Sequence, residues 1–254
     1  MKRRDFIKAT GTVTLAAGVY LTILKPSPVN AKEEKDWLNG YDWSKHHWGF
    51  GIDSTTCIGC GSCVRACKEE NDVPKDPYHF RCWVERYAHL KGEEKPKVDS
   101  PNGGYNSFPD KYKEEEVLKS FFVPKLCNQC AVPPCVQVCP VGATYQTKDG
   151  VVLVDNDYCI GCRYCISACP FGARYMNDEV GCADKCTWCY HRITKGLEPA
   201  CVLACPVEAR IFGDLKDENS NISKFIREHK IITLKPDLGC EAKVAYIGID
   251  SEVR

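Results

Sequence analysis

The sequence predicts an α+β fold with two small subdomains, loop-rich insertions, and a C-terminal helix and strand. Three observations support this prediction. Sixteen of the nineteen cysteines fall into four groups of four, the first and third groups match each other over eleven residues, and a short apolar run leads into each of these two groups. Nineteen cysteines in 254 residues is well above ordinary globular usage, so cysteine chemistry must organise much of the fold.

The four groups are called motifs one to four. They are Cys57, Cys60, Cys63 and Cys67; Cys127, Cys130, Cys135 and Cys139; Cys159, Cys162, Cys165 and Cys169; and Cys186, Cys189, Cys201 and Cys205. Three further cysteines, Cys82, Cys182 and Cys240, lie outside them. The spacing within the motifs distinguishes a disulfide framework, structural zinc and iron–sulfur clusters.

Motifs one and three follow C-x2-C-x2-C-x3-C, in which three thiolates hold one cube and the fourth reaches a neighbouring cube. Motif two widens the middle gap with Val132-Pro133-Pro134, and motif four is C-x2-C-x11-C-x3-C. Paired C-x2-C zinc hairpins do not explain three cysteines at two-residue gaps followed by a fourth. A thioredoxin-like redox pair fails because no C-x2-C stands alone. The spacing therefore predicts [4Fe-4S] clusters bound by these sixteen cysteines.

Residues 1–31 are typical of a twin-arginine export signal. Arg3 and Arg4 are followed by Phe6, a mildly apolar run over residues 9–24, and small residues at Val29 and Ala31 for cleavage. A membrane span needs about 20 apolar residues, and this run is shorter and contains glycines and threonines. We expect a cleaved signal, with a retained anchor as the alternative, and we expect no other span in the chain.

The charge of the remaining chain excludes one class of partner. Outside residues 1–31, 29 basic residues stand against 33 acidic ones. A nucleic-acid surface needs a basic excess to neutralise phosphates, so the composition argues against one.

The elements are predicted in chain order by apolar runs and turn residues. A polar and aromatic lead-in over residues 32–47 precedes a strand at 50–53, and a helix at 64–71 leaves motif one. The adjacent His46 and His47 are interpreted as polar surface, because neighbouring side chains on an extended chain point in opposite directions. Residues 91–119 are charged and rich in turn residues, so we expect a mobile surface insertion there.

The second half repeats this arrangement. Lys148-Asp149-Gly150 predicts a hairpin turn between residues 144–147 and 151–155, and a helical turn at 166–168 ends at Pro170. Residues 219–230 predict an amphipathic helix capped by Ser220 or Asn221, and residues 244–249 predict a final strand. Residues 57–67 and 159–169 are identical at seven of eleven positions, which indicates an internal duplication.

From about Trp48 to Gly213 the chain resembles the four-cluster ferredoxin-like beta subunits of molybdopterin oxidoreductases, which serve dimethyl sulfoxide, polysulfide, thiosulfate and tetrathionate reductases and formate dehydrogenases. The resemblance rests on the order of the four motifs, the proline-bearing gap of motif two, and the segments 126–130, 183–186 and 200–206. Residues 213–217 are nearest to the tetrathionate-reductase kind. All sixteen cysteines of the family pattern are present, so the resemblance implies four [4Fe-4S] clusters.

The resemblance also implies how the motifs pair, because in this family motif one pairs with four and two with three, with the last cysteine of each crossing over. The implied ligand sets are set I, Cys57, Cys60, Cys63 and Cys205; set II, Cys67, Cys186, Cys189 and Cys201; set III, Cys127, Cys130, Cys135 and Cys169; and set IV, Cys139, Cys159, Cys162 and Cys165. One ferredoxin-like bi-cluster subdomain then comprises residues 48–98 and 180–215, and the other residues 120–179. A surface insertion at 99–119 and a C-terminal extension at 216–254 complete the chain.

The function implied by the resemblance is electron transfer without catalysis. The partners would be a catalytic, molybdopterin-dependent subunit and an integral membrane subunit that reacts with quinone or quinol, in a complex of anaerobic respiration on the periplasmic side of the cytoplasmic membrane. Neither nucleic acid nor a small-molecule substrate is expected to bind this protein. The terminal substrate and the direction of electron flow stay open.

The alternative is an iron–sulfur enzyme that acts directly on a small sulfur-containing substrate. Such an enzyme would leave one iron with an open ligand position, whereas sixteen cysteines fill every ligand position of four cubes. This count favours the electron carrier. We expect the three cysteines outside the motifs to be buried structural thiols; they are Cys82, Cys182 and Cys240. An enzymatic role, if there is one, would involve these thiols.

Overall fold

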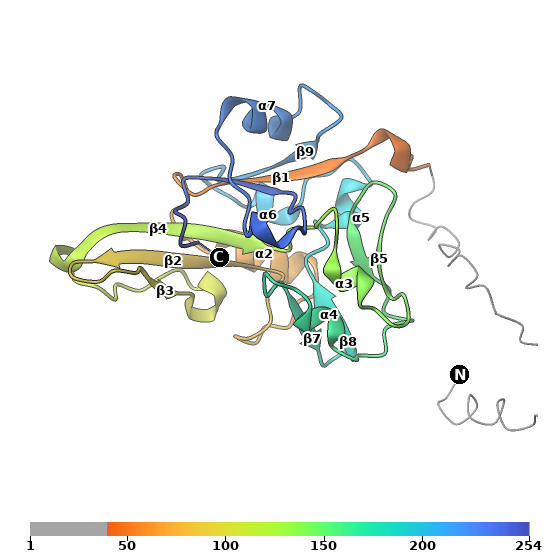
Figure 1. The fold of residues 1–254 in the computed structure, drawn as a ribbon, viewed down its shortest axis with the longest axis horizontal. Coiled ribbons are helices and arrows are strands. Elements are labelled where there is room, and N and C mark those ends of the chain that lie inside the picture. The colour runs from red at the N-terminus through yellow and green to blue at the C-terminus, as the bar shows by residue number, and fades with distance from the viewer. Residues whose placement is uncertain (1–39, 254) are drawn as a thin grey trace, which may run out of the picture. The chain divides into compact units, whose positions relative to one another are not determined.

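The computed structural model describes residues 40–253, so the predicted export signal and the first half of the lead-in segment lie outside the described residues. This part of the chain forms two three-stranded sheets, two short hairpins and a set of short helices (Figure 1). The predicted α+β class is confirmed. Within residues 40–253, no helix combines the length and the apolar character that crossing a membrane requires.

The first sheet joins the start and the end of the described chain. Strand β1 (Trp48–Asp53) lies between β9 (Arg210–Asp214), which is antiparallel to it, and β10 (Val244–Ile247), which is parallel. Both predicted strands are confirmed, with β1 starting two residues earlier and β10 ending two residues earlier than expected. Phe50 and Ile52 are fully buried, so this sheet forms the centre of the core.

Helix α7 (Asn221–Glu228) covers this sheet, packing against β9 and β1 (Figure 1). Ser220 is its N-cap: the side-chain oxygen accepts a hydrogen bond from the backbone N–H of Ser223 at 3.2 Å. Ile222 and Phe225 are buried and Ile226 is partly buried. The amphipathic helix predicted over residues 219–230 is therefore confirmed, one turn shorter.

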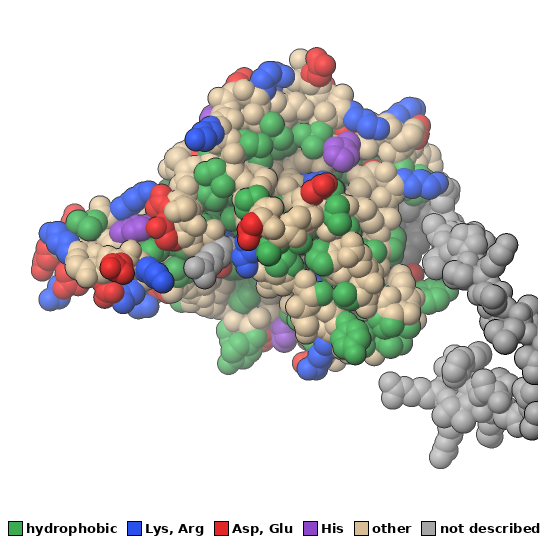
Figure 2. All heavy atoms as spheres, in the orientation of Figure 1, with side chains coloured by type: hydrophobic (Ala, Val, Ile, Leu, Met, Phe, Trp, Pro, Cys, Tyr) green, Lys and Arg blue, Asp and Glu red, His purple; other side chains and the backbone are tan. Residues whose placement is uncertain are grey.

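The second sheet was not predicted. Strand β2 (Cys82–Leu90) pairs antiparallel with both β4 (Val117–Leu126) and β3 (Lys97–Asp99). The insertion predicted over residues 91–119 lies at the surface, where most of its side chains are exposed, but it has more regular structure than expected. It forms β3, two 3-10 turns (Pro101–Gly104 and Glu114–Glu116) and the start of β4. Charged side chains cover the tip of this sheet in Figure 2.

Two hairpins and five further short helices complete the described part of the fold. Strands β5 (Thr144–Gln146) and β6 (Val152–Val154) form the predicted hairpin, and β7 (Arg174–Asn177) pairs with β8 (Cys182–Lys185). The helices are α2 (Ser62–Glu70), α3 (Pro134–Gln137), α4 (Tyr164–Ser167), α5 (Tyr190–Ile193) and α6 (Ala200–Leu203), and two more 3-10 turns span Trp43–Lys45 and Pro236–Leu238. Helix α2 packs against α6 and α3 against α4, so motif one meets motif four and motif two meets motif three.

Candidate iron–sulfur sites

The four motifs share one backbone feature. In each, the residue before the second cysteine has a positive φ: Gly59 (67°), Gln129 (45°), Gly161 (68°) and Trp188 (54°). Glycine reaches this left-handed region at little cost, whereas Gln129 and Trp188 need support from their surroundings. The Gln129 side chain is fully buried, donates to the Cys186 carbonyl at 2.8 Å and accepts from the Val152 N–H at 2.7 Å. The four loops therefore share this backbone conformation, although only motifs one and three have a glycine at this position.

The last cysteine of motifs two, three and four is followed by a proline, and the chain then turns back over the sulfur. The Thr144 N–H lies 3.4 Å from Cys139 Sγ, and the Ala209 N–H lies 3.3 Å from Cys205 Sγ. Burial opposes the charge of Cys139, but the backbone N–H groups of residues 141–144 outweigh it and lower the pKa of this thiol. At Cys139 the turn therefore favours a thiolate.

Motif one departs from this pattern because Lys68 replaces the proline. Helix α2 therefore continues beyond Cys67 to Glu70. The Lys68 ammonium donates to the carbonyls of Pro74 (2.6 Å) and Asp76 (2.7 Å). The side-chain amide of Asn71 lies 3.7 Å from Cys67 Sγ and 3.6 Å from Cys189 Sγ, and thus supplies the N–H donor that backbone turns supply elsewhere.

The fold brings the thiols of different motifs together. Cys57 lies within charge-interaction range of Cys63 and Cys205, and Cys67 within that of Cys186, Cys189 and Cys201. Cys130 has Cys127, Cys135 and Cys169 as neighbours, together with Cys240. These neighbours correspond to the members of sets I, II and III. The members of set IV come from the α3 and α4 motifs, which pack together.

Two observations test whether iron–sulfur clusters fit these thiols. Cys127, Cys130, Cys135 and Cys169 line one cavity together with Pro133, Pro134, Pro170 and Phe171. Arg210 is 3% exposed, and within residues 40–253 no hydrogen-bond partner meets its Nε and Nη2 atoms. A buried cation needs a negative partner, and a cluster held by thiolates is an anion that accepts N–H donors at sulfur. The residues present therefore fit the group.

Metal binding must displace protons from these thiols. Burial raises the pKa of the Cys57 thiol to about 11 and that of Cys130 to about 12. Metal binding removes these protons, because a coordinating thiol is deprotonated outright. All nineteen cysteines are free, so no disulfide competes for the ligands.

Two of the sites lie near the surface at different places. Cys162 is exposed, and the side chains of Tyr158, Ile160 and Tyr164 around it are 45%, 58% and 64% exposed. Figure 2 shows hydrophobic side chains gathered over this part of the molecule, where α3 and α4 lie.

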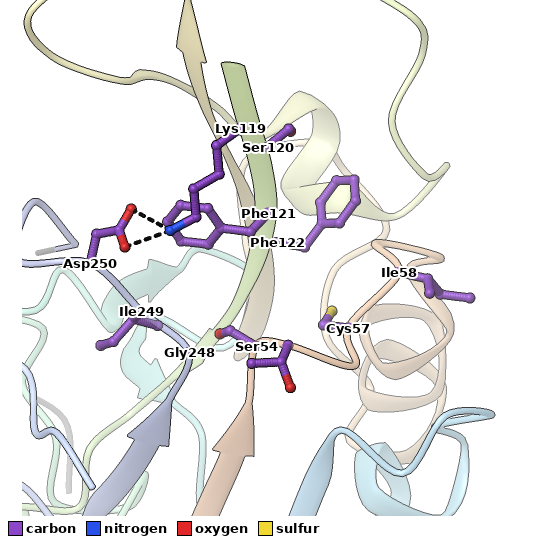
Figure 3. Close-up of a pocket in the computed structure, with 11 residues that line it drawn as sticks. Ser54, Cys57, Ile58, Lys119, Ser120, Phe121, Phe122, Gly248, Ile249 and Asp250 are labelled. Carbon is purple, nitrogen blue, oxygen red and sulfur yellow. Dashed lines mark hydrogen bonds and ion pairs between the residues drawn. The ribbon is translucent and has the colours of Figure 1, made fainter. Parts of the chain in front are cut away.

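The second place is Cys57, which borders an open pocket with Ile58, Phe121, Phe122 and Ile249 (Figure 3). At the rim of this pocket Lys119 Nζ pairs with both carboxylate oxygens of Asp250, at 2.7 and 3.0 Å. Sets I and IV therefore each reach a surface with exposed apolar side chains nearby.

The three cysteines outside the motifs are buried, as expected. Cys82 is 1% exposed and lies next to Cys63, whose carbonyl accepts from its thiol at 3.4 Å. Cys182 donates to the Asn156 carbonyl at 3.3 Å, and Cys240 to that of Leu238 at 3.6 Å.

The histidine pair is not brought together as a metal site. His46 stacks on the rings of both Tyr41 and Trp48, and its Nδ1 lies 2.7 Å from Asp214 Oδ2. Among residues 40–253, His46 and His47 belong to no cluster of three or more metal-ligating side chains. His46 is thus an anchor of the lead-in segment rather than simple polar surface.

Comparison with known proteins agrees with this geometry. Two family models, each described as a 4Fe-4S dicluster domain, match residues 56–143 and 118–215. The chain is thus a protein of two 4Fe-4S dicluster domains, and it binds four [4Fe-4S] clusters.

Curated relatives define the family further. The chain is 39% identical to the B subunit of tetrathionate reductase from Salmonella typhimurium, over 98% of this chain and 88% of the relative. It is 40% identical to the iron–sulfur B subunit of a putative dimethyl sulfoxide reductase from Halobacterium salinarum (79% of each chain). It is 36% identical to the B component of polysulfide reductase from Wolinella succinogenes (79% and 93%). The protein belongs to this family of reductase iron–sulfur B subunits, and the resemblance found in the motifs is confirmed.

Proposed function

We propose that this chain is the electron-transfer subunit of an anaerobic respiratory complex and has no catalytic site of its own. The observation that carries the proposal is the ligand count: four groups of four thiols fill all the ligand positions of four clusters. Each cluster, when bound, accepts and releases one electron at a time. The chain's own residues hold the clusters, bury them, and direct N–H donors at the sulfurs.

The proposed ligand sets are sets I to IV, with the last cysteine of each motif crossing to the partner motif. The packing of α2 against α6 and of α3 against α4 supports this pairing. The neighbours of Cys57, Cys67 and Cys130 support sets I to III, since each of these thiols lies near members of its own set.

The proposed partners are a catalytic redox subunit and an integral membrane subunit that reacts with quinone or quinol. The relatives are B subunits of reductases, which supports a place within a complex of several subunits. The exposed apolar side chains near Cys162 and the pocket beside Cys57 are suitable for two separate contacts. We propose a location on the periplasmic side of the cytoplasmic membrane, reached through the twin-arginine signal and kept through partner subunits.

The test uses the purified protein under anaerobic conditions. Dithionite should reduce the clusters and a mild oxidant should restore them, with no turnover of tetrathionate or other sulfur oxyanions in the presence of reduced viologen. A Cys57→Ala variant serves as control and should lose reducible cluster. Turnover of a sulfur compound by the lone wild-type protein would overturn the proposal in favour of the enzymatic alternative.

A further inference from the structure

Three cations are buried among the ligand thiols. Arg174, Lys185 and Arg210 are 5%, 0% and 3% exposed. Other buried cations of this protein, such as Arg86 with Asp99 and Lys125 with Glu85, are paired with a carboxylate. Over residues 40–253, none of the three forms a salt bridge with an acidic side chain. Burying a charge without a partner costs much free energy, so the partner must be sought among the sulfurs.

Arg210 lies between sets I and II. Its Nη1 is 3.8 Å from Cys201 Sγ, a member of set II. The backbone N–H of Ala209, the residue before Arg210, lies 3.3 Å from the Sγ of Cys205, a member of set I. Arg210 therefore stands beside a ligand of each set.

Arg174 lies between sets III and IV in the same way. Its Nη2 is 3.1 Å from Cys135 Sγ, and its Nη1 donates to Thr144 Oγ1 at 3.3 Å. The Thr144 N–H in turn lies 3.4 Å from the Sγ of Cys139, a member of set IV. Cys135 belongs to set III, so Arg174 is also connected to two sets.

Lys185 lies between the two pairs. Its ammonium donates to the carbonyl of Cys186 at 2.8 Å and to that of Val152. Cys186 is a member of set II. Val152 lines the cavity that the set III cysteines Cys127, Cys130, Cys135 and Cys169 share. The three cations therefore occupy the three successive steps from set I to set IV.

Two of these cations stand at equivalent places relative to their motifs. Arg174 and Arg210 each stand five residues after the last cysteine of their motif, in Cys-Pro-Phe-Gly-Ala-Arg and Cys-Pro-Val-Glu-Ala-Arg. At the same distance after Cys139 stands Thr144, which accepts the hydrogen bond from Arg174. Each pair of motifs thus carries one arginine at the equivalent place. Lys185 occupies the step where the two pairs meet.

We infer that Arg210, Lys185 and Arg174 are positioning residues that stabilise the added electron at each of the three steps between the four cluster sites. The inference rests on the proposed ligand sets. Reduction makes a cluster more negative by one charge, and a fixed cation nearby in a medium of low dielectric lowers the free energy of the reduced state. Because each cation faces two sets, it raises the reduction potential of both. No bond forms. The two guanidiniums keep their protons at all relevant pH values, and the Lys185 ammonium donates to two backbone carbonyls.

The test removes each charge and measures potentials. Arg210→Gln, Arg174→Gln and Lys185→Met are compared with wild type in an anaerobic titration with dithionite, followed by electron paramagnetic resonance, with iron content measured on the same samples. Arg210→Gln should lower the potentials of two of the four components, and Arg174→Gln those of the other two. Lys185→Met should lower one component from each pair.

Matched variants separate charge from packing. Arg210→Lys and Arg174→Lys keep the charge and should shift the same components less than the glutamine variants do. Arg86→Gln removes a buried arginine that binds Asp99 through two hydrogen bonds of 2.9 and 2.8 Å, within the β2–β3–β4 sheet. This variant should leave all four potentials unchanged.

The inference is overturned if the glutamine variants carry full iron with unchanged potentials, or if the lysine variants shift the potentials as much. A glutamine variant that binds less iron than wild type is compared with the lysine variant at the same position. Normal iron content in the lysine variant supports a role of the positive charge, and an equal loss of iron in both variants contradicts it. Failure of the proposed function would appear differently, as wild-type protein that is not reversibly reduced.

Discussion

Gly61 and Arg163 occupy the same place in the repeat, directly after the second cysteine of motifs one and three. Both have a positive φ, 73° and 67°, and both stand at the N-cap of a helix. Their surroundings differ. A Cβ on Gly61 would lie 2.1 Å from the Gly104 carbonyl oxygen and 2.8 Å from that of Tyr105, whereas Arg163 is exposed. The glycine is required by the close approach of the segment that leads from β3 to β4.

This contrast gives a prediction at the residue scale. Gly61→Ala should destabilise the protein by about 2 kcal/mol or more, because a backbone segment rather than a side chain must move. Arg163→Ala should change stability by no more than about 0.5 kcal/mol. Thermal unfolding of the iron-loaded variants measures both. Equal effects at the two positions would contradict the account.

The cluster ligands could be predicted from the sequence because short cysteine spacing leaves few alternatives. The residues around them could not all be predicted in this way. Gln129 and Trp188 adopt a backbone conformation that a glycine signals in the other two motifs, and only tertiary packing reveals them. Arg174 and Arg210 had a signal, their equal distance from the last cysteine, but burial among thiols becomes visible only in the fold.

At the scale of elements, Asp149 connects four parts of the chain. Its carboxylate, 1% exposed, accepts hydrogen bonds from Tyr41 (2.6 Å), Trp48 (3.1 Å) and Tyr190 (3.1 Å), and from Thr147 within its own hairpin. The β5–β6 turn is thereby joined to the lead-in segment, β1 and α5. Sequence analysis predicted the turn but assigned Asp149 no role beyond it.

Removal of this carboxylate should therefore loosen several elements together. Hydrogen bonds to a charged group contribute about 1.5–3 kcal/mol, so Asp149→Ala should lower the free energy of unfolding by at least about 3 kcal/mol. The exposed Asp178 provides the control, and Asp178→Ala should be nearly neutral. Chemical denaturation of both variants checks the prediction, and a neutral Asp149→Ala would disprove the central position of this residue.

Elements whose pattern of apolar and turn residues lies within one short segment could be predicted from the sequence. Strands β1 and β10, the β5–β6 hairpin, α2 and α7 were all predicted to within a few residues. The β2–β4 ribbon was missed, because charged and turn residues over 91–119 conceal the pairing of strands that lie far apart in sequence. Burial alternates only over the first half of β2, where Cys82, Val84 and Arg86 are buried and Trp83 and Glu85 are partly buried.

For the whole molecule, the duplication explains why the chain can hold a row of clusters. Each half pairs two motifs through short helices, α2 with α6 and α3 with α4, and Lys185 lies where the halves meet. In the proposed order of the sets, the row ends at sets I and IV, and Cys57 of set I and Cys162 of set IV lie at the surface. Such an arrangement suits passage of electrons through the protein between two partners.

Export concerns the whole molecule, because a twin-arginine signal carries proteins that are already folded and already contain their cofactors. Replacing Arg3 and Arg4 together by lysine keeps the charge but removes the paired arginines, and it should retain nearly all of the protein in the cytoplasm. Lys8→Arg is the matched control and should leave export intact. Cell fractionation measures the distribution, and unchanged export of the double variant would refute the proposed signal.

The central claim is that one chain carries four clusters able to hold one electron each. Anaerobic reductive titration of the purified protein, with iron measured on the same sample, tests it most directly. The account predicts uptake of about four electrons per chain on about sixteen irons, all recovered on reoxidation. Uptake of about two electrons or fewer on about eight irons in fully loaded protein would contradict it.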